Sequence, residues 1–144
     1  MEEISFKIAS SEGEVNAARV IRNQVFVLEQ GIPEELDIDS DEDRSVHLLA
    51  VGRNLQFIGT GRLTINEDTG ILSRISVLNS YRNKGIGKSI ILELEKLARE
   101  KGVKKLILSP HLHLENFYTG LGYKKIVGHQ IAGGYKLISM IKLI

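Results

Sequence analysis

The segment from Arg82 to Gly87 carries residue types and a spacing that suit the binding of a pyrophosphate. It follows an apolar run, Ile71 to Leu78, and opens a long amphipathic pattern that predicts a helix. The first N–H groups of a helix have no partners within it, and the helix dipole favours an anion there. Gly85 and Gly87 let the backbone approach a ligand closely. Cationic side chains surround these glycines: Arg82, Lys84 and Lys88.

Two common phosphate-binding loops do not fit this spacing. A dinucleotide-binding G-x-G-x-x-G pattern that starts at Gly85 would need a third glycine where Ile90 stands. A Walker A loop that ends at Gly87-Lys88-Ser89 would need glycine in place of Arg82. The pattern that remains is R-x-x-G-x-G between a strand and a helix.

A second group of reactive side chains lies in the acidic segment, which we define as residues 34–43. It holds seven acidic residues and no lysine or arginine, although the whole chain has a net charge of +1. An EF-hand calcium loop starting at Asp37 would need glycine at Glu42 and a carboxylate at Leu48, so the segment fails that pattern. One interpretation is a solvated loop. The functional hypothesis is an acidic lip that attracts a cationic amine.

The elements that must position these residues follow from hydrophobic periodicity. Alternation predicts a strand over residues 4–9, and the capping box Ser11-Glu12-Gly13-Glu14 opens a helix that is expected to end near Gly31. Further strands are expected over residues 46–51, 55–65, 71–78, 103–108, 123–127 and 135–143. Helices are expected from Gly85 to Lys101 and from Glu115 to Leu121. This order predicts an α/β fold with a mixed sheet and helices on both faces.

The strand expected over residues 103–108 is apolar without a period-2 pattern, which predicts a central strand buried on both faces. The final two strands are expected to flank Gly133-Gly134.

Composition limits the class of protein. With 144 residues, 42% hydrophobic and 26% charged, the chain has the size and balance of one globular domain. It has no cysteine, which excludes disulfides, thiolate metal sites and a cysteine nucleophile. No apolar run is long enough to span a bilayer and the N-terminus has no signal-peptide pattern, so we expect a cytoplasmic protein without membrane contact.

Three features together resemble the GNAT N-acetyltransferases: the order of the elements, the R-x-x-G-x-G pattern, and the segments Asn116-Phe117-Tyr118 and Leu121-Gly122-Tyr123. The resemblance covers essentially the full chain. The segment from Val25 to Pro33, followed by the acidic segment and Val46-His47-Leu48, is similar to the ElaA-like bacterial branch. We therefore expect a single GNAT-type α/β domain over residues 1–144, with a mostly antiparallel sheet of six to seven strands and a splayed pair of central strands.

The resemblance implies transfer of an acetyl group from acetyl-CoA to an amine by direct attack in a ternary complex, without a metal. In the family, the strand before the loop parts from its neighbour, and its backbone pairs with the amide groups of pantetheine. The N–H groups of the loop then hold the pyrophosphate, with the arginine beside it. The coenzyme-binding residues implied here are Ile75, Ser76, Val77, Arg82, Asn83, Lys84, Gly85, Ile86, Gly87 and Lys88.

The resemblance also implies catalytic residues. Tyr118 matches the family tyrosine that protonates the departing thiolate, and a phenol with an ordinary pKa of about 10 keeps its proton at neutral pH. For the general base we expect Glu29, at the end of the first helix where the family places its acceptor site, or a histidine. The histidines considered are His47, His111 and His113, with His47 and His111 favoured by chemistry. A chain of water molecules is the remaining alternative.

Two other classes of function were weighed. A non-catalytic sensor of coenzyme A or a nucleotide would keep the phosphate-binding loop without needing Tyr118. A nucleic-acid-binding protein is disfavoured, because the chain has four tyrosines, four phenylalanines and no tryptophan, and basic and aromatic residues do not interleave. The acceptor amine is not encoded in any recognisable motif, and the oligomeric state stays open, with a homodimer as one option.

Overall fold

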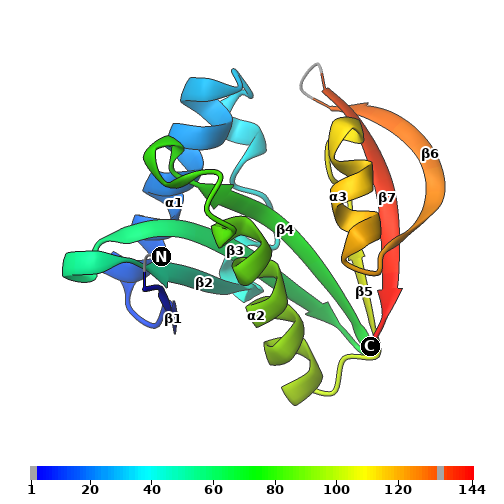
Figure 1. Ribbon diagram of the computed structural model, residues 1–144, viewed down its shortest axis with the longest axis horizontal. Coiled ribbons are helices and arrows are strands. Elements are labelled where there is room, and N and C mark those ends of the chain that lie inside the picture. The colour runs from blue at the N-terminus through cyan, green and yellow to red at the C-terminus, as the bar shows by residue number, and fades with distance from the viewer. Residues whose placement is uncertain (1–2, 133–134) are drawn as a thin grey trace.

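The computed structural model describes residues 3–132 and 135–144, and these form one seven-stranded sheet with helices packed against it (Figure 1). The strand order is β1-β2-β3-β4-β5-β7-β6. The strands are β1 (Ser5–Ile8), β2 (Val46–Val51), β3 (Phe57–Asn66), β4 (Thr69–Val77), β5 (Lys105–Leu108), β6 (Lys124–Ala132) and β7 (Tyr135–Leu143). Neighbouring strands are antiparallel except β4 and β5, which are parallel. The expected mixed, mostly antiparallel sheet is confirmed.

The first helix begins where the capping box predicts. Helix α1 (Glu12–Arg22) is capped by the Ser11 side chain, which accepts a hydrogen bond from the Glu14 N–H group at 3.1 Å. It continues as a π-helical segment, η1 (Asn23–Glu29), so the helical region ends close to the expected glycine at residue 31. The other helices are α2 (Ile86–Glu100) and α3 (Glu115–Gly120). Short 3₁₀ turns lie at η2 (Glu34–Leu36), η3 (Glu42–Arg44), η4 (Arg53–Leu55), η5 (Asn79–Tyr81) and η6 (Leu112–Leu114).

The helices cover both faces of the sheet, as expected. Leu48 of β2 belongs to the main core with residues of α2, whereas the next residue, Leu49, packs with Ala18 and Ile21 of α1. Successive side chains of a strand point to opposite faces, so α1 and α2 lie on opposite sides of the sheet. Helix α3 joins the side of α2, because Tyr118 and Tyr123 belong to the same core.

The feature of the sheet that matters for the site is the limited pairing of β4 with β5. The two strands pair only where Thr69–Ile71 faces Lys105–Ile107, although β4 continues to Val77. Beyond that point they diverge, and Figure 1 shows β5, β7 and β6 turning away from the other four strands. Strand β4 also contains an irregularity, where the register with β3 shifts and Arg74 takes a left-handed φ of 55°. The expected splayed pair of central strands is confirmed.

Some details differ from the expectations. Strand β5 is not buried on both faces: Leu106 and Leu108 are buried, while Lys105 and Ile107 are half-exposed. The physical reason is that α1 packs over β2, β3 and β4, which leaves the corresponding face of β5 partly uncovered. Strand β3 begins at Phe57 because the preceding turn holds two residues with positive φ, Asn54 and Leu55. Strand β6 is longer than expected, and Gly133-Gly134 lies outside the described residues.

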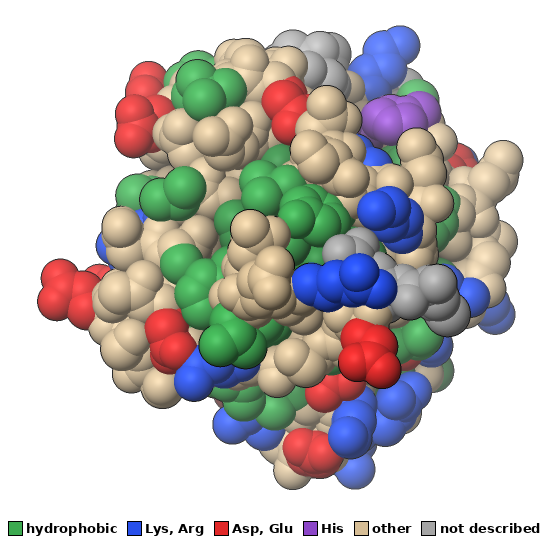
Figure 2. All heavy atoms as spheres, turned by 60° about the vertical axis from the view of Figure 1, so that its left-hand side comes forward, with side chains coloured by type: hydrophobic (Ala, Val, Ile, Leu, Met, Phe, Trp, Pro, Cys, Tyr) green, Lys and Arg blue, Asp and Glu red, His purple; other side chains and the backbone are tan. Residues whose placement is uncertain are grey.

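The surface does not identify a partner. Figure 2 shows hydrophobic side chains in the middle of one face of the molecule, with charged side chains around them. Large apolar side chains that are exposed include Val20, Leu28 and Leu55. Among the described helices, none has the length and apolar character needed to cross a bilayer. The homodimer stays a prediction.

Candidate functional site

The loop from Arg82 to Gly85 joins the end of β4 to the start of α2. Asn83 and Gly85 both have a left-handed backbone, with φ of 63° and 76°. This conformation costs an L-residue energy and costs glycine almost none. No side chain caps the first N–H groups of α2, so these donors face outward from the helix start. The loop therefore has the geometry of an anion site.

The two glycines leave space at the start of α2. A Cβ atom added to Gly85 would meet no other atom within 4 Å, and one added to Gly87 would meet only Val77 Cγ2, at 3.9 Å. Packing within the protein therefore does not explain why residue 87 is glycine. The open space suits a ligand that approaches the backbone, and the residues present fit a pyrophosphate.

Arg82 ties this loop to two other elements. Its Nε donates to the Val77 carbonyl at 3.0 Å, and its Nη1 and Nη2 lie 2.7 and 2.9 Å from the Glu29 carboxylate. One guanidinium thus joins the last residue of the π-helical segment, the end of β4 and the loop from Arg82 to Gly85, which we call the coenzyme loop after the ligand expected there. Two residues expected in different roles, Glu29 and Arg82, form an ion pair with each other.

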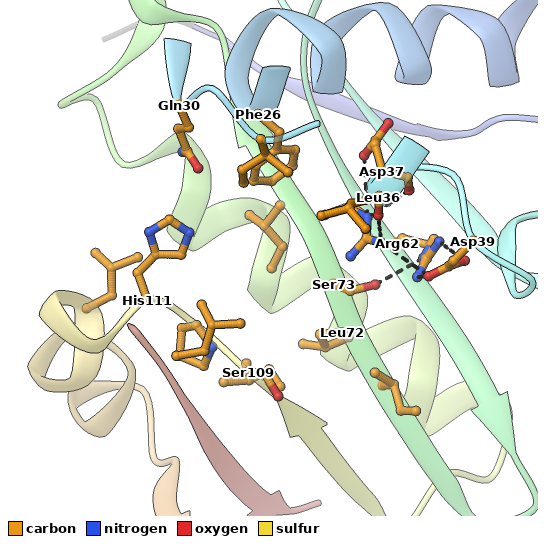
Figure 3. A pocket seen from close by; sticks show the side chains of 18 of the residues that line it. Phe26, Gln30, Leu36, Asp37, Asp39, Arg62, Leu72, Ser73, Ser109 and His111 are labelled. Atoms are coloured by element: carbon orange, nitrogen blue, oxygen red, sulfur yellow. Dashed lines mark hydrogen bonds and ion pairs between the residues drawn. The ribbon is translucent and has the colours of Figure 1, made fainter. Parts of the chain in front are cut away.

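A pocket of about 620 Å³ opens between the diverging strands. Figure 3 shows Phe26 and Gln30 on the α1 side of this pocket, opposite Ser109 and His111 on the β5 side. Most of the lining is apolar and comes from three parts of the chain: Phe26, Ile32 and Leu36; Ile71, Leu72 and Ile75; and Leu108, Leu114 and Leu137. An apolar cavity lining interrupted by polar groups is the usual form of a small-molecule site, and the polar groups here include five charged side chains: Asp37, Asp39, Asp41, Arg62 and Arg74.

Tyr118 lines this pocket from α3, and its side chain is only 6% exposed. Burial raises the pKa of Tyr118 to about 12, so the phenol keeps its proton at neutral pH. The ring packs edge-to-face on Phe117 and Tyr123, with centroid distances of 5.0 and 5.9 Å. These ring contacts hold the Tyr118 side chain in place in the pocket wall.

His111 and His113 line the same pocket and pack edge-to-face on each other, with ring centroids 5.7 Å apart. Burial lowers the pKa of His111 below its ordinary value of 6.5, and His113 lowers it further. His111 is therefore neutral at neutral pH and able to accept a proton.

The residues expected from the sequence divide into two groups. The pocket brings together Ile75, His111 and Tyr118. The coenzyme loop, Glu29, Ser76 and Val77 are not part of its lining, although Val77 contacts the loop through Arg82. His47 lies elsewhere: it is 4% exposed, its Nε2 is 3.0 Å from the Glu42 carbonyl, and its buried Nδ1 has no hydrogen-bond partner among the described residues.

The acidic segment is only partly the solvated loop that its charge predicts, because two of its acids are buried. Asp37 and Glu42 are 6% and 3% exposed, and buried Arg22 holds both, at 2.9 Å from Asp37 and 3.0 Å from Glu42. Asp39 pairs with Arg62 at 2.9 Å, and the hydrogen bonds from Arg62 lower the pKa of Asp39 to about 2. Folding thus pairs these three carboxylates with arginines from α1 and the sheet. The attraction of a cationic amine by the acidic segment stays a hypothesis.

We define the ion-pair wall as the side chains of Arg22, Asp37, Asp39, Glu42, Arg62 and Arg74. Sequence reasoning missed its three arginines. A signal was available at Arg22, which follows Ala18 by four residues on the apolar face of α1. Arg62 likewise stands inside an apolar strand pattern. A buried arginine needs an anionic partner, and the nearby acidic run offers several.

Comparison with known proteins agrees with this geometry. The family model described as the acetyltransferase (GNAT) family matches residues 17–123. The uncharacterized N-acetyltransferase YjcF of Bacillus subtilis is 36% identical over 117 residues, which cover 81% of this chain and 83% of that protein. Protein ElaA of Escherichia coli is 26% identical over 118 residues, covering 78% of this chain and 76% of ElaA.

Solved structures share the fold. The crystal structure of Escherichia coli ElaA superposes with a TM-score of 0.85 and 23% identity, covering 99% of both chains. A GNAT family acetyltransferase from Elizabethkingia anophelis, solved with acetyl-CoA bound, gives a TM-score of 0.76 and 17% identity over 98% of both chains. The sequence match, the splayed sheet and the glycine loop agree, and the chain belongs to the GNAT acetyltransferase family, with ElaA-like relatives.

Proposed function

We propose that this protein transfers the acetyl group of acetyl-CoA to an amine by direct attack in a ternary complex. The observation that carries the proposal is the divergence of β4 from β5, which opens a pocket with Tyr118 in its wall. The same strand leads, through Val77 and Arg82, to the coenzyme loop. A donor thioester lying along β4 would have its phosphates at the loop and its acetyl group at the pocket.

Donor binding is assigned to backbone groups. The edge of β4 beyond Ile71 is not paired with β5, so the main chain at Ile75–Val77 is available for the amide groups of pantetheine. The N–H groups from Asn83 to Lys88 would hold the pyrophosphate. Acetyl-CoA bound to the Elizabethkingia anophelis protein of the same fold supports this choice of donor.

The reaction joins the amine nitrogen to the acetyl carbonyl carbon and then breaks the carbon–sulfur bond. The amine must lose a proton, and the departing thiolate gains one. Tyr118 would donate to the sulfur, because burial keeps its phenol protonated. His111 would take the proton from the amine, because it lines the same pocket and burial favours its neutral form. Glu29 is the less suitable base, because its carboxylate is paired with Arg82 and does not line the pocket.

The test is an assay of thiol release from acetyl-CoA with a panel of amines, using wild type and Tyr118→Phe. A general acid contributes about 10²- to 10⁴-fold, so kcat should fall by about that factor while the Kd of coenzyme A stays within about twofold. Tyr123→Phe is the matched control, since it removes a phenol that donates to Glu95 and does not line the pocket.

Unchanged turnover in Tyr118→Phe would refute the role of this phenol. If coenzyme A binds to wild type but no amine elicits turnover, the non-catalytic sensor replaces the transferase.

A further inference from the structure

The ion-pair wall forms one end of the pocket, and the proposed reaction leaves this end for the acceptor. The pocket lining at this end includes the carboxylates Asp37, Asp39 and Asp41 together with Arg62 and Arg74. Figure 3 shows Arg62 and Asp39 joined at this end, with Leu36 and Ser73 beside them. The charge that an acceptor meets depends on which of these side chains still have unused hydrogen-bond donors or acceptors after folding.

The carboxylates are already paired. Asp37 lies 2.9 Å from Arg22 and 3.4 Å from Arg74, and Asp39 lies 2.9 Å from Arg62. Asp41 forms a separate ion pair with Arg44 at 2.8 Å. A polycation entering the pocket would have to compete with an arginine for each of these three carboxylates. The wall is therefore a poor site for a polyamine.

One nitrogen of the Arg74 guanidinium is an unused hydrogen-bond donor. Its Nε donates to the Asp37 carbonyl at 3.1 Å, and its Nη2 donates to the Leu36 carbonyl at 3.1 Å and to Asp39 at 3.2 Å. Its third nitrogen, Nη1, donates no hydrogen bond to any of residues 3–132 and 135–144. The side chain is 24% exposed and lines the pocket, so an incoming anion can reach it.

Arg74 keeps its positive charge in these surroundings. Burial lowers the pKa of Arg74, and the positive charges of Arg62 and Arg22 lower it further, against the opposing effect of Asp39 and Asp37. The guanidinium stays charged at neutral pH, since an arginine pKa begins far above that range. A carboxylate is the group whose geometry matches guanidinium donors.

We propose that the acceptor is an amine that also carries a carboxylate, an apolar amino acid, whose carboxylate is bound by Nη1 of Arg74. This inference rests on the proposed acetyl transfer and names its substrate class. The apolar body would lie against Phe26, Ile32 and Leu36, which line the pocket next to the wall. The amine would then point toward Tyr118 and His111.

The experiment compares amines that differ only in the carboxylate: phenylalanine with phenethylamine, and leucine with isoamylamine, with spermidine as the polycation. Wild type should show kcat/KM about tenfold or more higher for each amino acid than for its decarboxylated partner, since a charged hydrogen bond is lost in the latter. In Arg74→Lys the KM of the amino acids should rise toward that of the amines, while the KM of acetyl-CoA stays unchanged. Arg44→Gln is the matched control, because Arg44 bonds to the same acidic segment but does not line the pocket.

Binding measured by calorimetry, with coenzyme A present, separates this inference from the proposed function. Amino acids that bind to wild type and lose affinity in Arg74→Lys, without any turnover, would support the carboxylate site and overturn the transferase. Turnover of the plain amines or of spermidine at an equal or higher kcat/KM would support the transferase and overturn the carboxylate site. A carboxylate preference that persists in a folded Arg74→Lys variant would overturn the role of Arg74.

Discussion

The loop from Arg82 to Gly85 and the ion-pair wall are built in different ways. The loop uses backbone N–H groups and two glycines that are neighbours in sequence. The wall uses side chains from distant segments: Arg22 and Asp37 are 15 residues apart, and Arg74 and Asp37 are 37 apart. One surface is shaped by local conformation and the other by long-range ion pairs.

This difference predicts which property each surface controls, the stability of the fold or the binding of a ligand. The loop has open space at both glycines, so it can change without loss of packing. The wall contains charges that are almost fully buried, and a buried charge without its partner is strongly destabilising. Changes in the wall should therefore affect folding, whereas changes in the loop should affect ligand binding.

The largest effect is expected from Arg22→Met, which removes one guanidinium from Asp37 and Glu42. We expect the free energy of unfolding to fall by about 3–5 kcal/mol, as for other buried ion pairs that lose one partner. Urea denaturation followed by circular dichroism measures this. The matched control is Arg44→Met, whose pair with Asp41 is 47% and 36% exposed and should cost no more than about 1 kcal/mol. Equal effects of the two substitutions would show that the wall is not a stabilising element.

A second prediction concerns the pH dependence of turnover. If His111 is the base, kcat/KM falls as pH drops through its pKa, because the protonated ring cannot accept a proton. Burial lowers that pKa, so the loss lies below the ordinary value of 6.5. His111→Gln should remove this acid limb and lower kcat/KM by about 10²-fold at neutral pH. Glu29→Gln is the comparison variant and should keep the acid limb in place; a limb that disappears in Glu29→Gln instead would assign the base to that carboxylate.

The smallest effect, and the one confined to the loop, is expected from Gly87→Val. The new side chain would occupy the open space at the start of α2, so the KM of acetyl-CoA should rise by about tenfold, equivalent to about 1.4 kcal/mol. The melting temperature should stay constant or rise slightly, because valine is a better helix former than glycine.

Gly13→Val provides the matched control for the loop. Gly13 is the second residue of α1, as Gly87 is of α2, and it also has room for a Cβ atom. An equal rise in KM in both variants would mean that the space at Gly87 has no part in coenzyme binding.

Local patterns in the sequence determined much of this protein. The capping box predicted the start of α1, and R-x-x-G-x-G predicted an anion site at the start of α2; the helix begins one residue after the left-handed Gly85. The starts of both helices were predicted correctly because caps and helix starts depend on residues that are close along the chain. The anion site at the start of α2 stays a prediction. The order of the elements likewise indicated the mixed sheet, and the resemblance to the GNAT family implied its splayed strands; the structure confirms both.

The tertiary structure alone decided which charges meet at the ion-pair wall. The sequence gives an acidic segment without a single basic residue, and only folding brings Arg22, Arg62 and Arg74 onto its carboxylates. Which charges meet depends on strand order and register, and no local pattern encodes those contacts. For the same reason the sequence named Tyr118 and His111 separately, and the divergence of β4 from β5 placed them in one pocket.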